Sequence, residues 1–189
     1  ITSDTMYEYD AAGNRVKTTD GDGRDWTSTY SARGFLLTET DPLGNTTRYQ
    51  YDALGNKTAV SDPRNTGPGD RRYTTWFIYD DQNRLVRTVL PDNTPPSNTE
   101  LQSGSYDNPF IEVTYDRLGN KLTERDVNGL VAFYDYDLRG RVIRTGIMEG
   151  ETRKVKSQFT YDGKGNRTRV ESVSTVDDVL DNVVQFQYD

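Results

Sequence analysis

Apolar and polar side chains alternate along short stretches of this chain, and each stretch ends in a turn signature. In segment 47–62, Tyr49 and Tyr51 alternate with polar neighbours, the two-residue period of a strand with one apolar face. The next four residues, Asp-Ala-Leu-Gly at 52–55, have type I turn chemistry, with a carboxylate first and glycine where φ is often positive. Residues 57–60 run back. The segment predicts a β-hairpin.

The same pattern recurs in seven complete copies, and an eighth begins at Tyr188. The first three tyrosines are 21 residues apart. The repeat tyrosines are Tyr9, Tyr30, Tyr51, Tyr79, Tyr115, Tyr136 and Tyr161. The expected structural turn residues are Asp10, Gly13, Gly34, Asp52, Gly55, Asn83, Asp116, Gly119, Asp137, Gly140, Asp162 and Gly165. Asn83 stands where the other copies have glycine, and asparagine tolerates the left-handed region best among the remaining residues.

A second set of Asp-x-x-Gly turns lies between these copies, at 20–23, 41–44 and 126–129, and Asp62-Pro63 starts a longer version. Turns every ten or eleven residues leave room for strands of ordinary length, so we expect an all-β antiparallel meander. Insertions rich in Pro, Gly, Asn and Ser at 64–72 and 91–109 are expected to be loops, and 149–153 a milder, charged version. No convincing helix is expected. We expect the array to form one domain over 1–189, as a fragment of a longer chain.

The sequence also predicts which side chains share a face. Residues on the tyrosine face of the incoming strands are mostly apolar and the opposite face is mostly polar, so we expect an aromatic inner face and a wet outer face. Six residues after the tyrosine the copies alternate. We expect the apolar set to lie on a covered outer face. The basic set is Arg15, Lys57, Lys121 and Arg167, and the apolar set is Leu36, Leu85 and Val142.

Composition excludes several kinds of function. The net charge of -7 argues against DNA or RNA as a partner, because phosphate neutralisation needs a basic patch. The chain has neither His nor Cys, which removes the usual general base, thiol nucleophile and imidazole or thiolate metal sites. No apolar run approaches the roughly 18–20 residues of a membrane span. We therefore expect no enzyme, no cofactor and no membrane insertion.

Two features raise the question of a ligand. Asp20, Asp22 and Asp25 resemble the start of a calcium loop, but Arg24 occupies the third ligand place of the EF-hand spacing, so a turn is the better interpretation. The Tyr and Trp rows are either the inner face of the sheet or platforms that stack on sugars. Trp26 and Trp76 are the candidates for sugar stacking, which makes a carbohydrate-binding adhesin on a cell-surface glycan the alternative function.

Copies of Tyr-Asp-x-x-Gly-Asn-Arg with Asp-Pro-x-Gly-Asn between them resemble the YD repeats of the Rhs (rearrangement hotspot) family. The best matches are Tyr51-Asp52-Ala53-Leu54-Gly55-Asn56-Lys57 and the run from Asp41 to Thr46. The family includes bacterial Rhs toxins, wall-associated proteins, insecticidal toxin complex C subunits and teneurins. The resemblance implies a curved β-sheet that spirals into a hollow shell, secreted or on a bacterial cell surface. It also implies flanking repeats of the same chain and an enclosed effector as partners.

The resemblance also implies a self-cleaving core after the last repeats in toxin members. Asp41-Pro42-Leu43-Gly44 is superficially similar to the end of that core. Asn45 replaces the expected Leu and another repeat follows directly, so we interpret the segment as a turn. No effector sequence is present in these 189 residues.

Overall fold

The computed structural model describes residues 4–65, 70–92, 94–173 and 180–187. Within them the chain is an antiparallel β-meander, which confirms the expected fold class. Its contacts divide it into two compact units, unit 1 (Ile1–Pro109) and unit 2 (Phe110–Asp189). None of the helices found in the described residues is long and apolar enough to cross a membrane.

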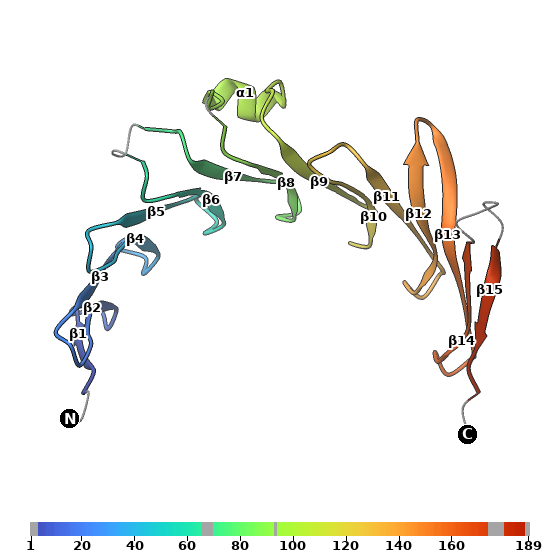
Figure 1. Ribbon diagram of the computed structural model, residues 1–189, viewed down its shortest axis with the longest axis horizontal. Coiled ribbons are helices and arrows are strands. Elements are labelled where there is room, and N and C mark those ends of the chain that lie inside the picture. Colours follow the sequence, from blue (N-terminus) through green and yellow to red (C-terminus); the bar gives the residue numbers. More distant parts are fainter. Residues whose placement is uncertain (1–3, 66–69, 93, 174–179, 188–189) are drawn as a thin grey trace. The chain divides into compact units, whose positions relative to one another are not determined.

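Unit 1 is built from strands that pair antiparallel, each with the next along the chain (Figure 1). Hairpins with short turns allow only this arrangement, because the returning strand lies beside the one before it. The strands are β1 (Met6–Tyr9), β2 (Arg15–Thr19), β3 (Asp25–Tyr30), β4 (Leu36–Thr40), β5 (Thr46–Tyr51), β6 (Lys57–Ser61), β7 (Thr74–Tyr79) and β8 (Leu85–Val89).

Unit 2 repeats the arrangement with longer strands in its middle. Its strands are β9 (Phe110–Tyr115), β10 (Lys121–Arg125), β11 (Val131–Tyr136), β12 (Val142–Glu149), β13 (Thr152–Tyr161), β14 (Arg167–Val173) and β15 (Leu180–Gln185). The expectation that 149–153 is a loop is wrong, because Glu149 pairs with Thr152 and the strands continue to a two-residue turn that contains Gly150 at φ 60°. The eighth copy, Tyr188-Asp189, lies outside the described residues.

The two sets of turns share one geometry but differ in the pairing that follows. After every repeat tyrosine with a described partner strand, the register shifts by one residue. In β5–β6, for example, Tyr51 opposes Lys57 whereas Gln50 opposes Ala59. The turns of the second set have no such shift, as in β2–β3, where Thr19 opposes Asp25 and Thr18 opposes Trp26. Bulged and regular hairpins therefore alternate from β1 to β8 and from β9 to β12, whereas the pairs β12–β13 and β14–β15 also carry a register shift.

This bulge corrects the expected faces. The sixth residue after each tyrosine opposes that tyrosine directly, so Lys57 lies on the tyrosine face and not on the outer face. Its ammonium lies 4.9 Å from the Tyr49 ring centroid. Lys57 is half-buried whereas Leu85, of the apolar set, is 36% exposed. The hypothesis that Leu36, Leu85 and Val142 lie on a covered outer face is therefore wrong.

The best-buried side chains of unit 1 lie on the face opposite Tyr79. Trp76 is 7% exposed and its Cα partners across the sheet, Ala59 and Val89, are 2% and 0% exposed. The expected wet outer face is wrong at β7. The reason is that the two insertions supply cover: Leu101 and Arg71 border the same cavity as Trp76.

Unit 2 has a matching buried row, again on the face opposite its repeat tyrosines. Phe133 of β11 is fully buried and opposes Gly146 of β12. The Arg153 guanidinium lies 4.6 Å from the centroid of the Phe133 ring and also donates to Asp135 Oδ1 at 2.7 Å. The Arg153 side chain covers the ring, and the absence of a side chain at Gly146 leaves room for it.

The insertion at 91–109 is not wholly a loop, and the expectation of no helix is wrong. It contains α1 (Asn98–Ser103), which Ser97 and Glu100 close at the N-terminus with a reciprocal capping box. Gly104, at φ 73°, ends it in the left-handed conformation. The signal was present as Ser-x-x-Glu followed by Gly. Six residues show too little hydrophobic periodicity to reveal it.

Candidate functional site

Most of the turns are held by an aspartate carboxylate, which in its full form accepts three hydrogen bonds. Asp52 Oδ1 accepts from the backbone N–H groups of Leu54 and Asn56, at 2.9 and 2.8 Å, and Oδ2 accepts from Asn56 Nδ2 at 2.8 Å. We call this arrangement the turn lock. Arginine replaces asparagine in some copies, where its Nε donates to the same oxygen. The asparagine locks are Asp10–Asn14, Asp41–Asn45, Asp52–Asn56, Asp116–Asn120 and Asp162–Asn166, and the arginine locks are Asp20–Arg24, Asp80–Arg84 and Asp137–Arg141.

Sequence reasoning assigned the turn to its first and fourth residues and missed the fifth. The recurrence of Asn or Arg directly after the fourth position was the available signal. The fourth residues take the conformation that the sequence requires: Asn83 has φ 65°, and the glycines at this position have φ from 74° to 99°. Two further turns use a variant of the lock. Ser31 Oγ in the second copy accepts from the backbone N–H of Phe35 at 3.1 Å, and Asp126 Oδ1 accepts from the backbone N–H groups of Asn128 and Leu130 at 2.9 and 2.8 Å.

The turn locks keep their aspartates ionised. The Asn56 side-chain amide is the main cause that lowers the pKa of Asp52 below its ordinary value. Burial opposes it, and backbone N–H groups add to the lowering. Asn14 and Asn120 lower the pKa of Asp10 and Asp116 in the same way, while the backbone N–H of Arg84 leads for Asp80. A neutral carboxylic acid accepts these bonds less well.

Acid should therefore destabilise the repeats. A carboxylate whose pKa is lower in the folded chain stabilises fully above the unfolded pKa, about 3.9, and loses this as pH falls through the folded pKa. We expect a constant melting temperature from pH 7 to pH 5 and a steep fall below about pH 4. Thermal unfolding followed by circular dichroism measures it. In Asp52→Asn the fall should be shallower than in the parent, and an unchanged pH profile would contradict the role of the lock.

The repeat tyrosines join one hairpin to the next. The hydroxyl of Tyr161 donates to the backbone carbonyl of Val142, at 2.7 Å, in the preceding copy. The same bond recurs with the carbonyl six residues after the preceding tyrosine. The other links are Tyr30 to Arg15 (3.1 Å), Tyr79 to Lys57 (3.1 Å) and Tyr136 to Lys121 (2.8 Å). Burial raises the pKa of Tyr79 and Tyr136, so their hydroxyls stay protonated donors at neutral pH.

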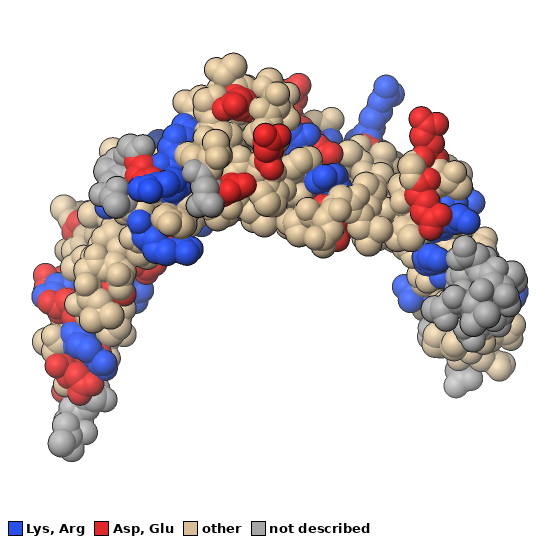
Figure 2. All heavy atoms as spheres, turned by 45° about the horizontal axis from the view of Figure 1, so that its top comes forward, with Lys and Arg blue, Asp and Glu red and all other residues tan. Residues whose placement is uncertain are grey.

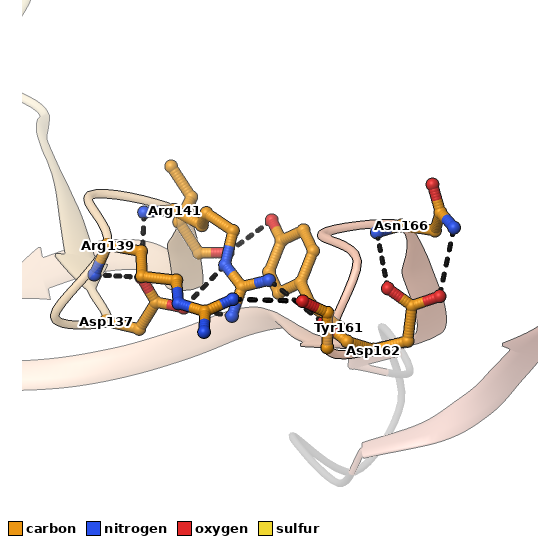
Figure 3. A network of polar contacts seen from close by, with 8 residues as sticks. Asp137, Arg139, Arg141, Tyr161, Asp162 and Asn166 are labelled. Atoms are coloured by element: carbon orange, nitrogen blue, oxygen red, sulfur yellow. Dashed lines mark hydrogen bonds and ion pairs between the residues drawn. The ribbon is translucent and has the colours of Figure 1, made fainter.

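The turns also contact each other along one edge of the sheet, as Figure 3 shows for copies six and seven. Arg141 closes the lock of its own Asp137 and reaches the carbonyl oxygen of Asp162 with Nη1 at 3.3 Å. Its guanidinium lies 4.5 Å from the Tyr161 ring centroid. Arg139 donates to the carbonyl of Gly163 at 3.1 Å, and Arg33, at the same place in the second copy, donates to that of Ala53 at 2.7 Å.

One cavity of about 720 Å³ lies between the sheet and the two insertions of unit 1. Its floor comes from β5 to β7 and includes Trp76, and its walls include Arg71 and α1. Arg71 joins the two insertions, because its Nη1 donates to Asn98 Oδ1 at 2.7 Å. Its guanidinium carbon lies 5.4 Å from the Trp76 ring.

The structure places the other sequence candidates as follows. Trp76 is buried in that cavity and Trp26 is half-buried in β3, so neither indole is a fully exposed platform, and glycan binding stays a prediction. Asp20 and Asp22 both bond Arg24, at 2.8 Å each, and Asp25 pairs with Lys17 at 3.0 Å. No group of three metal-ligating side chains occurs in the described part of the chain. Figure 2 shows charges of both signs interspersed on the face it draws.

Comparisons with known proteins agree with this repeat geometry. The sequence profile of the family described as RHS Repeat matches residues 30–66, which span the tyrosine hairpins of the second and third copies. Residues 30–66 therefore contain an RHS repeat. A relative is the tRNA3(Ser)-specific nuclease WapA of Bacillus spizizenii, which is 28% identical over 206 residues. The alignment covers 97% of this chain and 8% of the nuclease.

Solved structures share the fold. A crystal structure of TcdB2-TccC3-TEV superposes with a TM-score of 0.53 at 18% identity, over 90% of this chain and 10% of that one. A Photorhabdus luminescens Tc holotoxin pore gives a TM-score of 0.50 at 18% identity, over 89% of this chain and 10% of that one. The RHS-repeat chain thus spans about a tenth of the length of these relatives.

Proposed function

We propose that this chain is a structural segment of a secreted or cell-surface bacterial protein of toxin type. Its repeats form part of the wall of a β-shell that encloses a C-terminal effector. Three findings support this: the RHS repeat at residues 30–66, the WapA relative, and the fold shared with TccC3 structures. The segment contributes form and stability rather than chemistry, and its neighbours in the shell are further repeats of the same longer chain.

The observation that carries the proposal is the link from the hydroxyls of Tyr30, Tyr79, Tyr136 and Tyr161 to the preceding hairpin. A hairpin alone is marginally stable, and stacking neighbours makes stability a sum of nearest-neighbour contributions. Tyr161 has such a neighbour, and its side chain is half-buried. Tyr9 belongs to β1, the first strand of the described residues, and is 61% exposed. In a continuous wall an earlier hairpin covers Tyr9 and accepts its hydroxyl.

The two tyrosines give a test that compares this chain with the longer protein. Tyr161→Phe removes a hydrogen bond and should lower the free energy of unfolding by about 1 kcal/mol in both. Tyr9→Phe should be neutral in the 189-residue chain and should lower stability by a similar amount in the longer protein. Urea unfolding measures both. Neutrality of Tyr9→Phe in the longer protein would contradict a continuous wall. In that protein the region after the repeats should also resist protease, and rapid digestion would contradict enclosure.

A further inference from the structure

We propose that the cavity of unit 1 binds a carboxylate group, held by the Nε and Nη2 edge of Arg71. The inference is independent of the function proposed above. The cavity volume of about 720 Å³ lies within the range of small-molecule sites, about 300 to 1,000 Å³. Both insertions contribute to it, Arg71 from the first and Asn98, Leu101 and Gln102 from the second.

The guanidinium of Arg71 is fixed but only partly bonded. Nη1 donates to Asn98 Oδ1 at 2.7 Å, and the group lies against the Trp76 indole, so its position is set from two sides. Nε and Nη2 are shielded from solvent and have no hydrogen-bond partner within the described structure. A buried donor without an acceptor destabilises by about 1–3 kcal/mol, and more when it is charged. Two such donors on one edge point to an absent acceptor.

Neighbouring arginines show what that acceptor is. Nε and Nη2 of Arg72 donate to the two carboxylate oxygens of Asp70, at 3.0 and 2.9 Å. The same edge of Arg64 binds Asp62, at 2.8 and 3.1 Å. This planar pair of N–H groups matches the two oxygens of a carboxylate. Arg71 has the same edge, and no acceptor within the described residues occupies it.

The two carboxylates that border the cavity are already engaged. Asp70 accepts three hydrogen bonds from Arg72, at 2.9 to 3.1 Å, and its side chain is only 10% exposed. Asp52 is held by its turn lock with Asn56. Neither is free to turn toward Arg71 without breaking these bonds. The remaining lining offers the Trp76 ring and the amides of Gln50 and Gln102, which suit a small polar body attached to the carboxylate.

A carboxylate can come from an acidic sugar or from an acidic side chain, and matched probes separate the two. The sugar arm compares D-glucuronate with D-glucose. The peptide arm compares acetyl-Gly-Glu-Gly-amide with its Gln twin. Binding is followed by NMR of the arginine Nε–H groups in the whole chain. We expect the acid of at least one pair to shift the Arg71 resonance and the neutral twin to leave it in place.

Three variants test the geometry. Arg71→Lys keeps the charge but lacks the two-pronged edge, and should bind about ten-fold or more weakly. Arg64→Lys is the matched control, since its edge already holds Asp62, and should bind like the parent. Asn98→Asp places a carboxylate beside Arg71 and should also weaken binding, which decides the matter if Arg71→Lys does not fold. The proposal is overturned if neither acid binds, if neutral twins bind equally, or if a folded Arg71→Lys binds like the parent.

Discussion

Gly146→Ala is expected to lower the stability of unit 2 by about 3 kcal/mol or more, the upper range for overpacking a closed site. A Cβ at this position would lie 2.0 Å from the backbone oxygen of Lys154 and 2.7 Å from the Phe133 ring. Neither neighbour can yield cheaply. The oxygen belongs to the paired strand β13, and the ring is fully buried. The substitution must therefore separate β12 from β13 or expel Phe133.

Gly163→Ala is the matched control for this prediction. Gly163 lies in the same unit, in the turn after Tyr161, and a Cβ there would meet no atom within 4 Å. Urea unfolding followed by tyrosine fluorescence compares the two variants with the parent. Stabilities that differ by less than the measurement error would show that β13 can shift at no cost, and would contradict the packing described for Phe133.

Gly55→Val should be the most damaging turn substitution in unit 1, with a loss of about 2–4 kcal/mol. Gly55 has φ 95°, where a residue with a side chain is disfavoured by roughly 1–2 kcal/mol and a β-branched one by more. A Cβ would also lie 2.8 Å from the Phe35 ring, which stacks on Tyr51 with centroids 5.0 Å apart. Backbone strain and a clash with the preceding hairpin thus add together.

Two controls separate these contributions. Gly44→Val has nearly the same φ, 84°, but its Cβ meets no atom within 4 Å, so it should show the backbone strain alone. Ala53→Val lies in the same turn as Gly55 on an exposed residue and should change stability little. Thermal unfolding ranks the three. Equal melting temperatures for Gly55→Val and Ala53→Val would refute the role assigned to the left-handed glycine.

The sequence was most informative where a residue acts on its own backbone. Aspartate in the first turn position and glycine or Asn83 in the fourth are local requirements, so the turns and the meander could be predicted from them. The face of the sheet on which each side chain lies could not be predicted. A two-residue period assumes regular pairing, and the bulge after each tyrosine adds a residue that no side chain announces. Lys57 was therefore assigned to the wrong face.

The candidate site escaped prediction for a different reason. Arg71 and Asn98 are 27 residues apart in segments without any periodic pattern, and only the folded chain brings them together. Trp76 was named from the sequence as a candidate for sugar stacking, but its burial depends on cover from both insertions. The repeat tyrosines were assigned to one face of the sheet, yet their hydrogen bonds to main-chain carbonyls carry no sequence signal, because every residue has such a carbonyl.

Both insertions leave the strand ladder through a closed base. The backbone N–H of Asp62 donates to the carbonyl of Tyr73 at 3.0 Å, and that of Leu90 donates to Pro109 at 2.8 Å. Ordinary turns of this chain close with the same kind of bond, as between Asp52 and Asn56 at 2.9 Å. The scaffold therefore accommodates inserted loops of different lengths at these two positions. Binding residues in these loops can change in evolution, or be introduced by design, while the hairpins on either side keep their register.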